Sequence, residues 1–306
     1  MPPPKQFSLK EETPHMRPNT FSLIAAGIFL ISAIPCVAEP PTPPSGDIRR
    51  AAEQGDAAAQ FILGLIYHEG QGVTRDDVEA TKWWRKAAEQ GDAAAQLNLG
   101  FAYGNGQGVT QDYAEAAKWV RKVAEEGEAI AQYSLGVMYR TGQGVTQDDA
   151  EAVKWTRKAA DQNSAAAQGL LGLMYRTGRG VARDDTEAVK WTRKAAEQGH
   201  AAAQGLLGAM YHTGQGVVRD DAAAVKWTRT AANKGFAASQ GLLGFLYRDG
   251  QGIARNYALA YMWFSLAAAQ NHENSRRALD VLEKQVTPQQ RDEAQHMARE
   301  WKPIHN

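Results

Sequence analysis

The chain repeats one eight-residue segment six times, always 36 residues apart and without an insertion. The copies are GQGVTRDD (70–77), GQGVTQDY (106–113), GQGVTQDD (142–149), GRGVARDD (178–185), GQGVVRDD (214–221) and GQGIARNY (250–257). Stacked repeats share one continuous core, because each unit buries its apolar face against its neighbour. The strict period therefore predicts a linear array of units, in place of the two ordinary domains that a length of 306 residues would suggest.

Each unit begins with an apolar helix, described here on the first copy. Ala59, Leu63 and Tyr67 recur four residues apart and so share one side of a helix. Four positions are identical in all six copies, and in the first copy these are Gln60, Leu63, Gly64 and Tyr67. Glycine inside a helix costs about 1 kcal/mol relative to alanine. Its retention in every copy indicates that a second helix approaches closely at this position.

The repeated loop is expected to join two antiparallel helices. Gly70 would end the first helix in a left-handed conformation, and Asp76 would cap the second. In four copies a glutamate follows this aspartate three residues later, a pattern that resembles a capping box. The second helix keeps a tryptophan in every copy, Trp83 in the first, and we expect its ring to face an alanine and a glycine. The helix ends at glycine or asparagine, Gly91 in the first copy and Asn163 in the third, which both tolerate a left-handed cap.

The pattern Ala-x3-Leu-Gly-x2-Tyr-x2-Gly-x-Gly-Val-x2-Asp-x3-Ala-x2-Trp-x3-Ala-Ala-x2-Gly resembles the Sel1-like repeat, a relative of the tetratricopeptide repeat. The resemblance implies an all-α fold, a right-handed α/α superhelix or solenoid of six helix-turn-helix units that serves as a protein-interaction scaffold. It also implies an envelope adaptor or regulator, a role that exported bacterial members often have. The six predicted copies occupy residues 56–91, 92–127, 128–163, 164–199, 200–235 and 236–271.

One cysteine-rich branch of this family is associated with β-lactam binding or hydrolysis, so a β-lactamase-like hydrolase is the competing hypothesis. This chain departs from that branch because Cys36 is its only cysteine, which excludes an internal disulfide and a cysteine-based zinc site. No G-x-S-x-G or S-x-x-K motif is present, and the histidines do not have the spacing of metal ligands. We therefore expect a protein that is not an enzyme, with no catalytic residue, metal or cofactor.

Both ends of the array depart from the repeat pattern. Residues 47–55 match only the last part of a second helix, so they predict an N-terminal half-repeat. Residues 272–306 keep Leu279 but lose the glycine and tyrosine positions, and Thr287-Pro288 is typical of a helix start. We expect this last segment to form capping helices that cover the final repeat.

The first 38 residues are typical of a signal peptide. An uncharged stretch, FSLIAAGIFLISAIPCVA at 21–38, follows Arg17 and ends in a small-x-small pattern. We expect cleavage after Ala38 and a periplasmic or secreted mature protein. Met16 is the expected start of translation, because a leader that begins there has a more typical length and charge.

Two alternatives to cleavage remain open at this end, an uncleaved membrane anchor and a lipid attached to Cys36. The apolar stretch is marginal for spanning about 30 Å of hydrocarbon, which favours cleavage and no stable membrane insertion afterwards. The proline-rich residues 39–46 are expected to form a short, stiff linker to the repeats.

Charge is balanced along the chain, with 34 basic and 34 acidic residues, and this argues against a nucleic-acid-binding protein. The second helix does carry a basic set, Lys82, Arg85 and Lys86 in the first copy. Such a set would suit nucleic acid, but Glu79 and its equivalents stand three positions before the first lysine and favour a solvated outer face. We expect no nucleic-acid partner.

The first helix also carries positions that vary between copies, on the side away from the leucine–glycine–tyrosine stripe. In solenoids of this family the first helix lines a concave groove, so the resemblance makes these positions candidates for contact with a protein or an extended peptide. The candidate contact residues are Phe61, Leu65, Leu97, Phe101, Tyr133, Val137, Arg140, Arg176 and Arg248. The alternative is that the position of Leu65 and Phe101 only packs against the neighbouring first helix. The sequence leaves the identity of the partner and the oligomeric state open.

Overall fold

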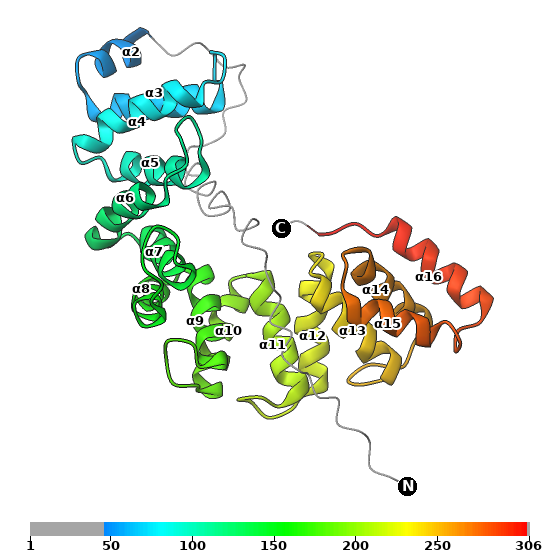
Figure 1. Ribbon diagram of the computed structural model, residues 1–306. Helices are drawn as coiled ribbons and strands as arrows, with labels where there is room; N and C mark the ends of the chain where they lie inside the picture. The colour runs from blue at the N-terminus through cyan, green and yellow to red at the C-terminus, as the bar shows by residue number, and fades with distance from the viewer. Residues whose placement is uncertain (1–45, 305–306) are drawn as a thin grey trace. The chain divides into compact units, whose positions relative to one another are not determined.

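The computed structural model describes residues 46–304, which form fifteen α-helices and no strand (Figure 1). Helix α2 (Gly46–Glu53) precedes the first repeat. The first helices of the six repeats are α3 (Ala57–Glu69), α5 (Ala93–Asn105), α7 (Ala129–Thr141), α9 (Ala165–Thr177), α11 (Ala201–Thr213) and α13 (Ala237–Asp249). The second helices are α4 (Asp77–Glu89), α6 (Tyr113–Glu126), α8 (Asp149–Asp161), α10 (Asp185–Glu197), α12 (Asp221–Asn233) and α14 (Tyr257–Ala269). The last two are α15 (Glu273–Leu282) and α16 (Pro288–Glu300). The expected signal peptide and nearly all of the expected linker lie outside the described residues.

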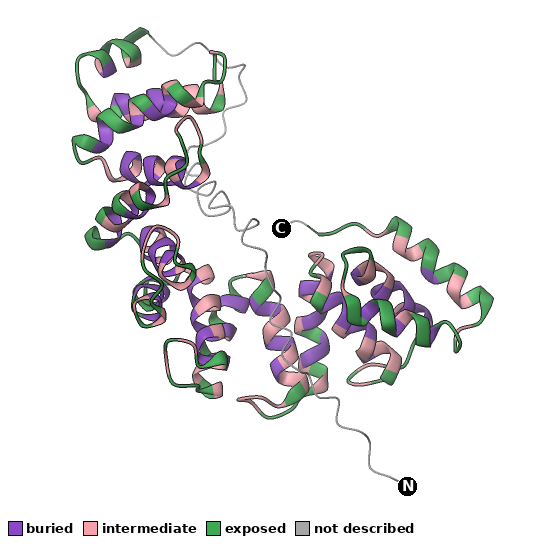
Figure 2. Ribbon diagram, viewed as in Figure 1, coloured by how far each residue is buried: buried purple, intermediate pink, exposed green. Residues whose placement is uncertain are grey.

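The contacts between helices divide the chain into two units, one up to Lys122 and one from Val123, so that the boundary falls inside α6. In the first unit α2 packs on α3, α3 on α4 and α4 on α5. In the second unit each helix from α7 to α14 packs on the helix that follows it. Buried residues lie where successive helices meet (Figure 2). This packing confirms the predicted all-α solenoid of helix-turn-helix repeats.

The helix ends follow the expected chemistry. Gly70 has φ 71°, and its backbone N–H donates to the Ile66 carbonyl, so that the first helix ends in a left-handed residue. Asn163 and Asn271 adopt the same left-handed backbone conformation after the second helices of their repeats, with φ 67° and 64°. These caps satisfy carbonyls that would otherwise remain unpaired at the end of a helix.

The aspartate caps are confirmed, but the predicted capping box is wrong for the second helices. Asp148 accepts hydrogen bonds from the backbone N–H groups of Ala150 and Glu151. The Glu151 side chain does not reach back to the cap. One of its oxygens instead accepts from the Trp155 indole at 3.0 Å, and the other lies 2.7 Å from the Lys154 ammonium. The glutamate faces these donors because positions three and four residues apart share a helix face.

The glycine inside each first helix does mark a close approach, as expected. A Cβ atom on Gly136 would lie 2.5 Å from Thr156 Oγ1 and 3.2 Å from the Ala152 carbonyl oxygen, both in the facing second helix. The tryptophan prediction, however, is off by one position. The residue that faces Gly64 is Trp84, while Trp83 lies beneath the Lys86 ammonium at 4.0 Å from the ring centroid. One residue turns the side chain by about 100°, so neighbouring positions point in different directions.

In four of the six loops the second glycine contacts the preceding repeat. A Cβ atom on Gly108 would clash with the backbone carbonyl of Asp77, in the first turn of α4. The same clash joins Gly180 to Asp149, Gly216 to Asp185 and Gly252 to Asp221. These four loops therefore dock onto the start of the previous second helix, and this contact favours one constant loop length.

Helices α15 and α16 close the end of the second unit. Both pack on α14, and the rings of Trp263 and Trp301 meet edge to face at 6.3 Å between centroids. Leu282 of α15 and Ala294 of α16 are fully buried. The chain after α16 returns to the preceding repeat, where the backbone N–H of Ile304 donates to the Asn233 carbonyl at 2.8 Å.

Candidate protein-binding face

The nine residues predicted to contact a partner fall into two groups by burial. Leu97 and Phe101, both on α5, are only 3% and 6% exposed, so they belong to the packing and not to an accessible surface. The other seven are partly exposed and lie on α3, α7, α9 and α13: Phe61, Leu65, Tyr133, Val137, Arg140, Arg176 and Arg248.

The second unit has a further accessible position that the sequence reasoning missed. Leu170, Leu206 and Leu242 occupy the same place in three consecutive first helices, and all three are partly exposed. Each stands three residues before the position that Leu65 and Phe101 occupy in their own repeats, so the two positions share one side of the helix. A search for apolar residues at a spacing of three along these helices would have found them.

We call these accessible apolar residues the first-helix face of the second unit. It consists of two residues from each of α9, α11 and α13: Leu170, Leu173, Leu206, Ala209, Leu242 and Phe245. Small residues one turn earlier, Ala166, Ala202 and Ala238, keep side chains from covering it. Three neighbouring repeats thus each contribute two accessible apolar side chains.

A charged edge runs beside the apolar positions. Arg140 and Arg176 are partly exposed, but the Nε atom of each is buried without a hydrogen-bond partner in the described chain. Burial lowers the pKa of Arg140 from its usual value. Arg248, at the same position in α13, pairs with Asp249 at 2.7 Å and lies 4.8 Å from the centroid of the Phe245 ring.

The basic set on the second helices is used for contacts within the array. Arg85 donates to the hydroxyl of Tyr103 in the next repeat at 2.6 Å, and Arg193 donates to Tyr211 at 2.8 Å. The neighbouring lysine lies over the tryptophan ring of its own helix, as Lys194 does over Trp191 at 4.5 Å. These contacts give the recurring tyrosines and tryptophans a structural role as acceptors and ring partners of the basic side chains.

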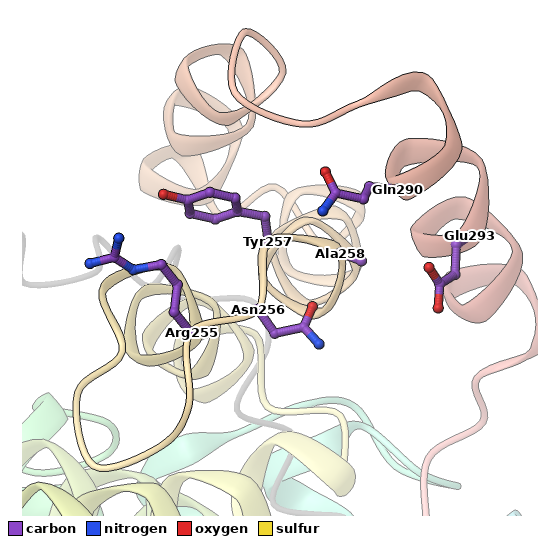
Figure 3. A pocket seen from close by; sticks show the side chains of 6 residues that line it. All are labelled: Arg255, Asn256, Tyr257, Ala258, Gln290 and Glu293. Carbon is purple, nitrogen blue, oxygen red and sulfur yellow. The ribbon is translucent and has the colours of Figure 1, made fainter.

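One small cavity of about 390 Å³ lies between the start of α14 and the side of α16 (Figure 3). Its lining side chains are Arg255, Asn256, Tyr257, Ala258, Gln290 and Glu293. Asn256 is engaged in capping α14, because its side-chain oxygen accepts the backbone N–H of Leu259 at 2.9 Å. The lining contains no serine, threonine, cysteine, lysine or histidine, so it does not present the nucleophile and base of a serine or cysteine hydrolase.

Residues 46–304 contain no group of three or more histidine, cysteine, aspartate or glutamate residues arranged to hold a metal ion. No helix among them combines the length and the apolar character that crossing a membrane requires.

A family model described as "Sel1 repeat" matches residues 57–92, 93–128, 129–164, 165–200, 201–236 and 237–272. The chain belongs to the Sel1 repeat family. The matched copies begin one residue after the boundaries expected from the sequence. Sel1 repeats are generally non-catalytic scaffolds that mediate protein–protein interactions.

A solved structure agrees with this assignment. The Sel1 repeat protein from Oxalobacter formigenes is 38% identical, with a TM-score of 0.64 over 76% of this chain and 67% of that one. The protein c5321, a protective antigen from uropathogenic Escherichia coli with an SLR fold, is 28% identical over 83% of this chain and 78% of that one, with a TM-score of 0.45. No curated protein matches this Sel1 repeat chain.

Proposed function

We propose that this Sel1 repeat protein is an exported, non-catalytic adaptor or regulator that binds a protein or an extended peptide along its first helices. The observation that carries the proposal is the first-helix face of the second unit, where three consecutive repeats each leave two apolar side chains partly exposed. Leu170 and Leu206 pack against the core of the unit with one side, so the face consists of the sides that remain accessible. Accessible apolar surface that recurs in neighbouring repeats is typical of protein-interaction sites.

The repetition of the face favours an extended ligand. Each repeat offers the same pair of apolar positions, for example Leu170 with Leu173 and Leu242 with Phe245. A segment that lies across the helices would meet one such pair in every repeat, so affinity would accumulate along its length. Phe245 is the aromatic member of the face and the strongest candidate anchor, because aromatic residues are enriched among interface hot spots.

Export to the periplasm or the cell surface is part of the proposal and depends on the sequence of residues 1–38. The described residues do not include that segment. An adaptor role in the envelope agrees with the absence of cysteine after Cys36, since an oxidising compartment then poses no risk of wrong disulfides.

A pull-down from the envelope fraction tests the proposal. We expect the wild-type protein to retain a specific partner and the variant Leu206→Glu/Leu242→Glu to lose it, because a buried unpaired carboxylate opposes binding. The matched control is Val218→Glu, which makes the same kind of change at a loop residue that is 87% exposed. Circular dichroism must show that all three proteins are folded. Retention of the partner by the leucine variant would contradict the proposal.

The competing hydrolase hypothesis has a direct test. Purified protein should leave nitrocefin intact at the rate of a buffer control. Hydrolysis that persists after a second purification step would contradict the adaptor hypothesis and support the hydrolase hypothesis.

A further inference from the structure

Arg140 and Arg176 hold equivalent positions in consecutive repeats, and neither has a carboxylate of the described chain within 4.0 Å. No carboxylate among residues 46–304 forms an ion pair with either guanidinium, although both side chains are partly buried. Other residues at this position are paired. His212 lies 3.2 Å from Asp221 and Arg248 lies 2.7 Å from Asp249. Apart from Gly104, which has no side chain, the two arginines are the exceptions at a position that otherwise meets a carboxylate.

The carboxylates that would pair with these arginines are engaged elsewhere. Asp149 is the counterpart of Asp221, but it binds Arg179 Nε at 2.8 Å. The same Arg179 donates to the Arg140 backbone carbonyl at 3.0 Å, which brings a second positive charge close to Arg140. In the next repeat Asp185 accepts from Arg183 at 2.9 Å and from Gln215 at 3.0 Å.

This arrangement leaves more positive than negative charge around each arginine. Asp149 interacts with Arg140 but is hydrogen-bonded to Arg179, and Asp185 interacts with Arg176 but is hydrogen-bonded to Arg183. A guanidinium stays protonated even when partly buried, because its pKa lies far above neutral pH. Burial lowers the pKa of Arg140, which shows that the surroundings oppose the charged form. Partly buried charges are normally paired, so an anion supplied from outside would complete the site.

The geometry points to a specific class of ligand: an acidic, partly apolar peptide segment that places one carboxylate on Arg140 and one on Arg176. This inference rests on the proposed function, since the segment would continue onto the first-helix face of the second unit. Val137 and Tyr133 stand one and two turns before Arg140 on α7, so that apolar contacts adjoin the charge. Carboxylates suit arginine because both groups are planar and form two parallel hydrogen bonds.

The spacing of the arginines predicts the spacing of the acids. Helices α7 and α9 both pack on α8, and their C-terminal ends come together where Arg179, just after α9, donates to the Arg140 carbonyl at 3.0 Å. We take roughly 10 Å, the spacing of packed helices, as the separation of the two helices at this end. An extended peptide rises about 3.3 Å per residue, so two acidic residues about three positions apart would reach both guanidinium groups. The expected core of the ligand is therefore Glu-x-x-Glu or its aspartate equivalent, with apolar residues beside it.

Peptide display on the mature chain, residues 39–306, tests this inference. Two libraries of dodecapeptides with randomised flanks are selected in competition, one with a fixed Glu-x-x-Glu core and one with Gln-x-x-Gln. We expect at least tenfold enrichment of the glutamate core on the wild-type protein. The variant Arg140→Gln/Arg176→Gln should abolish this preference.

The control removes two charges from the same repeats on the second helices. Lys154→Gln/Lys190→Gln changes side chains that are 56% and 54% exposed, and it should keep the preference for glutamate. Equal enrichment of both cores, or an equal loss in both double variants, would overturn the inference. The proposed function has its own test in the envelope pull-down, so a partner that depends on Leu206 and Leu242 but not on the arginines would keep the adaptor role and reject the acidic ligand.

Discussion

Lys234 leaves the side-chain oxygen of Gln204 without a hydrogen-bond donor. In other repeats a glutamine at the end of the second helix donates to this buried oxygen, as Gln198 does to Gln168 at 2.7 Å and Gln270 to Gln240 at 2.9 Å. The lysine ammonium instead donates to the Gly199 carbonyl at 2.9 Å. The buried Gln204 Oε1 atom consequently has no partner.

Restoring the glutamine should stabilise the protein. We expect Lys234→Gln to raise the free energy of unfolding by about 1 kcal/mol, because it satisfies a buried acceptor. In a chain of this size that gain raises the melting temperature by about 2–4 °C. Thermal unfolding followed by circular dichroism measures it. Lys226→Gln, on the exposed side of the same helix, is the control, and equal melting temperatures of the two variants would refute the prediction.

Substitution of the buried glycine tests the close approach of α7 and α8. Gly136→Val places a branched side chain against the Thr156 backbone nitrogen, which a Cβ atom alone would approach to 3.1 Å. We expect a loss of about 3 kcal/mol, since overpacking in a rigid core typically has an effect of this size. The control Ala202→Val changes an exposed alanine and should cost only about 0.5 kcal/mol through helix propensity. A similar denaturant midpoint for both variants would mean that the helices can separate.

Thr192 offers a substitution that should be tolerated or stabilising. Its hydroxyl is fully buried against Gly172 and has no hydrogen-bond partner. Val120 occupies the equivalent position of the second repeat, so the shape of valine is compatible with this site. We expect Thr192→Val to raise the free energy of unfolding by up to about 1 kcal/mol, because it removes a desolvated polar group. A clear loss of stability in urea unfolding would show that the hydroxyl has a partner in solution.

His200 should make the stability of α11 sensitive to acid. Its Nδ1 atom accepts the Ala203 backbone N–H at 3.3 Å, so the cap requires the neutral ring. Burial lowers the pKa of His200, and the nearby Lys234 charge lowers it further. The unfolded chain therefore takes up the proton first as the pH falls below about 6.5, and stability declines through that range toward the folded pKa.

The variant His200→Ser isolates this effect. Ser164 fills the same capping position in α9, with its hydroxyl accepting the Ala167 N–H, so the substituted helix keeps a cap. Unfolding in urea at pH 8 and pH 5 should show a smaller acid loss in the variant than in the wild type. All other histidines are common to both proteins, and an identical acid loss would assign the pH dependence to them.

Processing of the N-terminus is tested by sequencing the exported protein. We expect the mature chain to begin at Glu39, because the small residues before it are typical of a signal-peptidase site. A first residue at Cys36 that carries a lipid would support the lipoprotein alternative. Retention of the apolar stretch at 21–38 would support the anchor.

The repeat period allowed the helix pairs and their caps to be predicted, because local chemistry decides both. Asp76 and Gly70 act within one turn of their own position, so the sequence around them is sufficient. The choice between Trp83 and Trp84 as the residue that faces the glycine depends on the rotation of one helix against another, which the pattern of a single helix does not contain.

The candidate site was predictable in part for the same reason. Accessible positions such as Tyr133 and Arg176 follow from variation along the first helix. The burial of Phe101 and the missing partners of Arg140 do not, because both depend on side chains that come from elsewhere in the chain. The use of Asp149 by Arg179, 30 residues away, had to be seen in three dimensions.

The loop glycine that rests on the carbonyl of the preceding second helix also restricts how such a gene can change in length. An added residue in the loop at Gly180 would displace it from Asp149 and disturb two units together. Unequal recombination that gains or loses a whole 36-residue copy keeps every junction of the same type. Natural variation in the length of the array should therefore come in whole repeats. Homologous proteins with different numbers of repeats can then arise without a new type of contact between repeats.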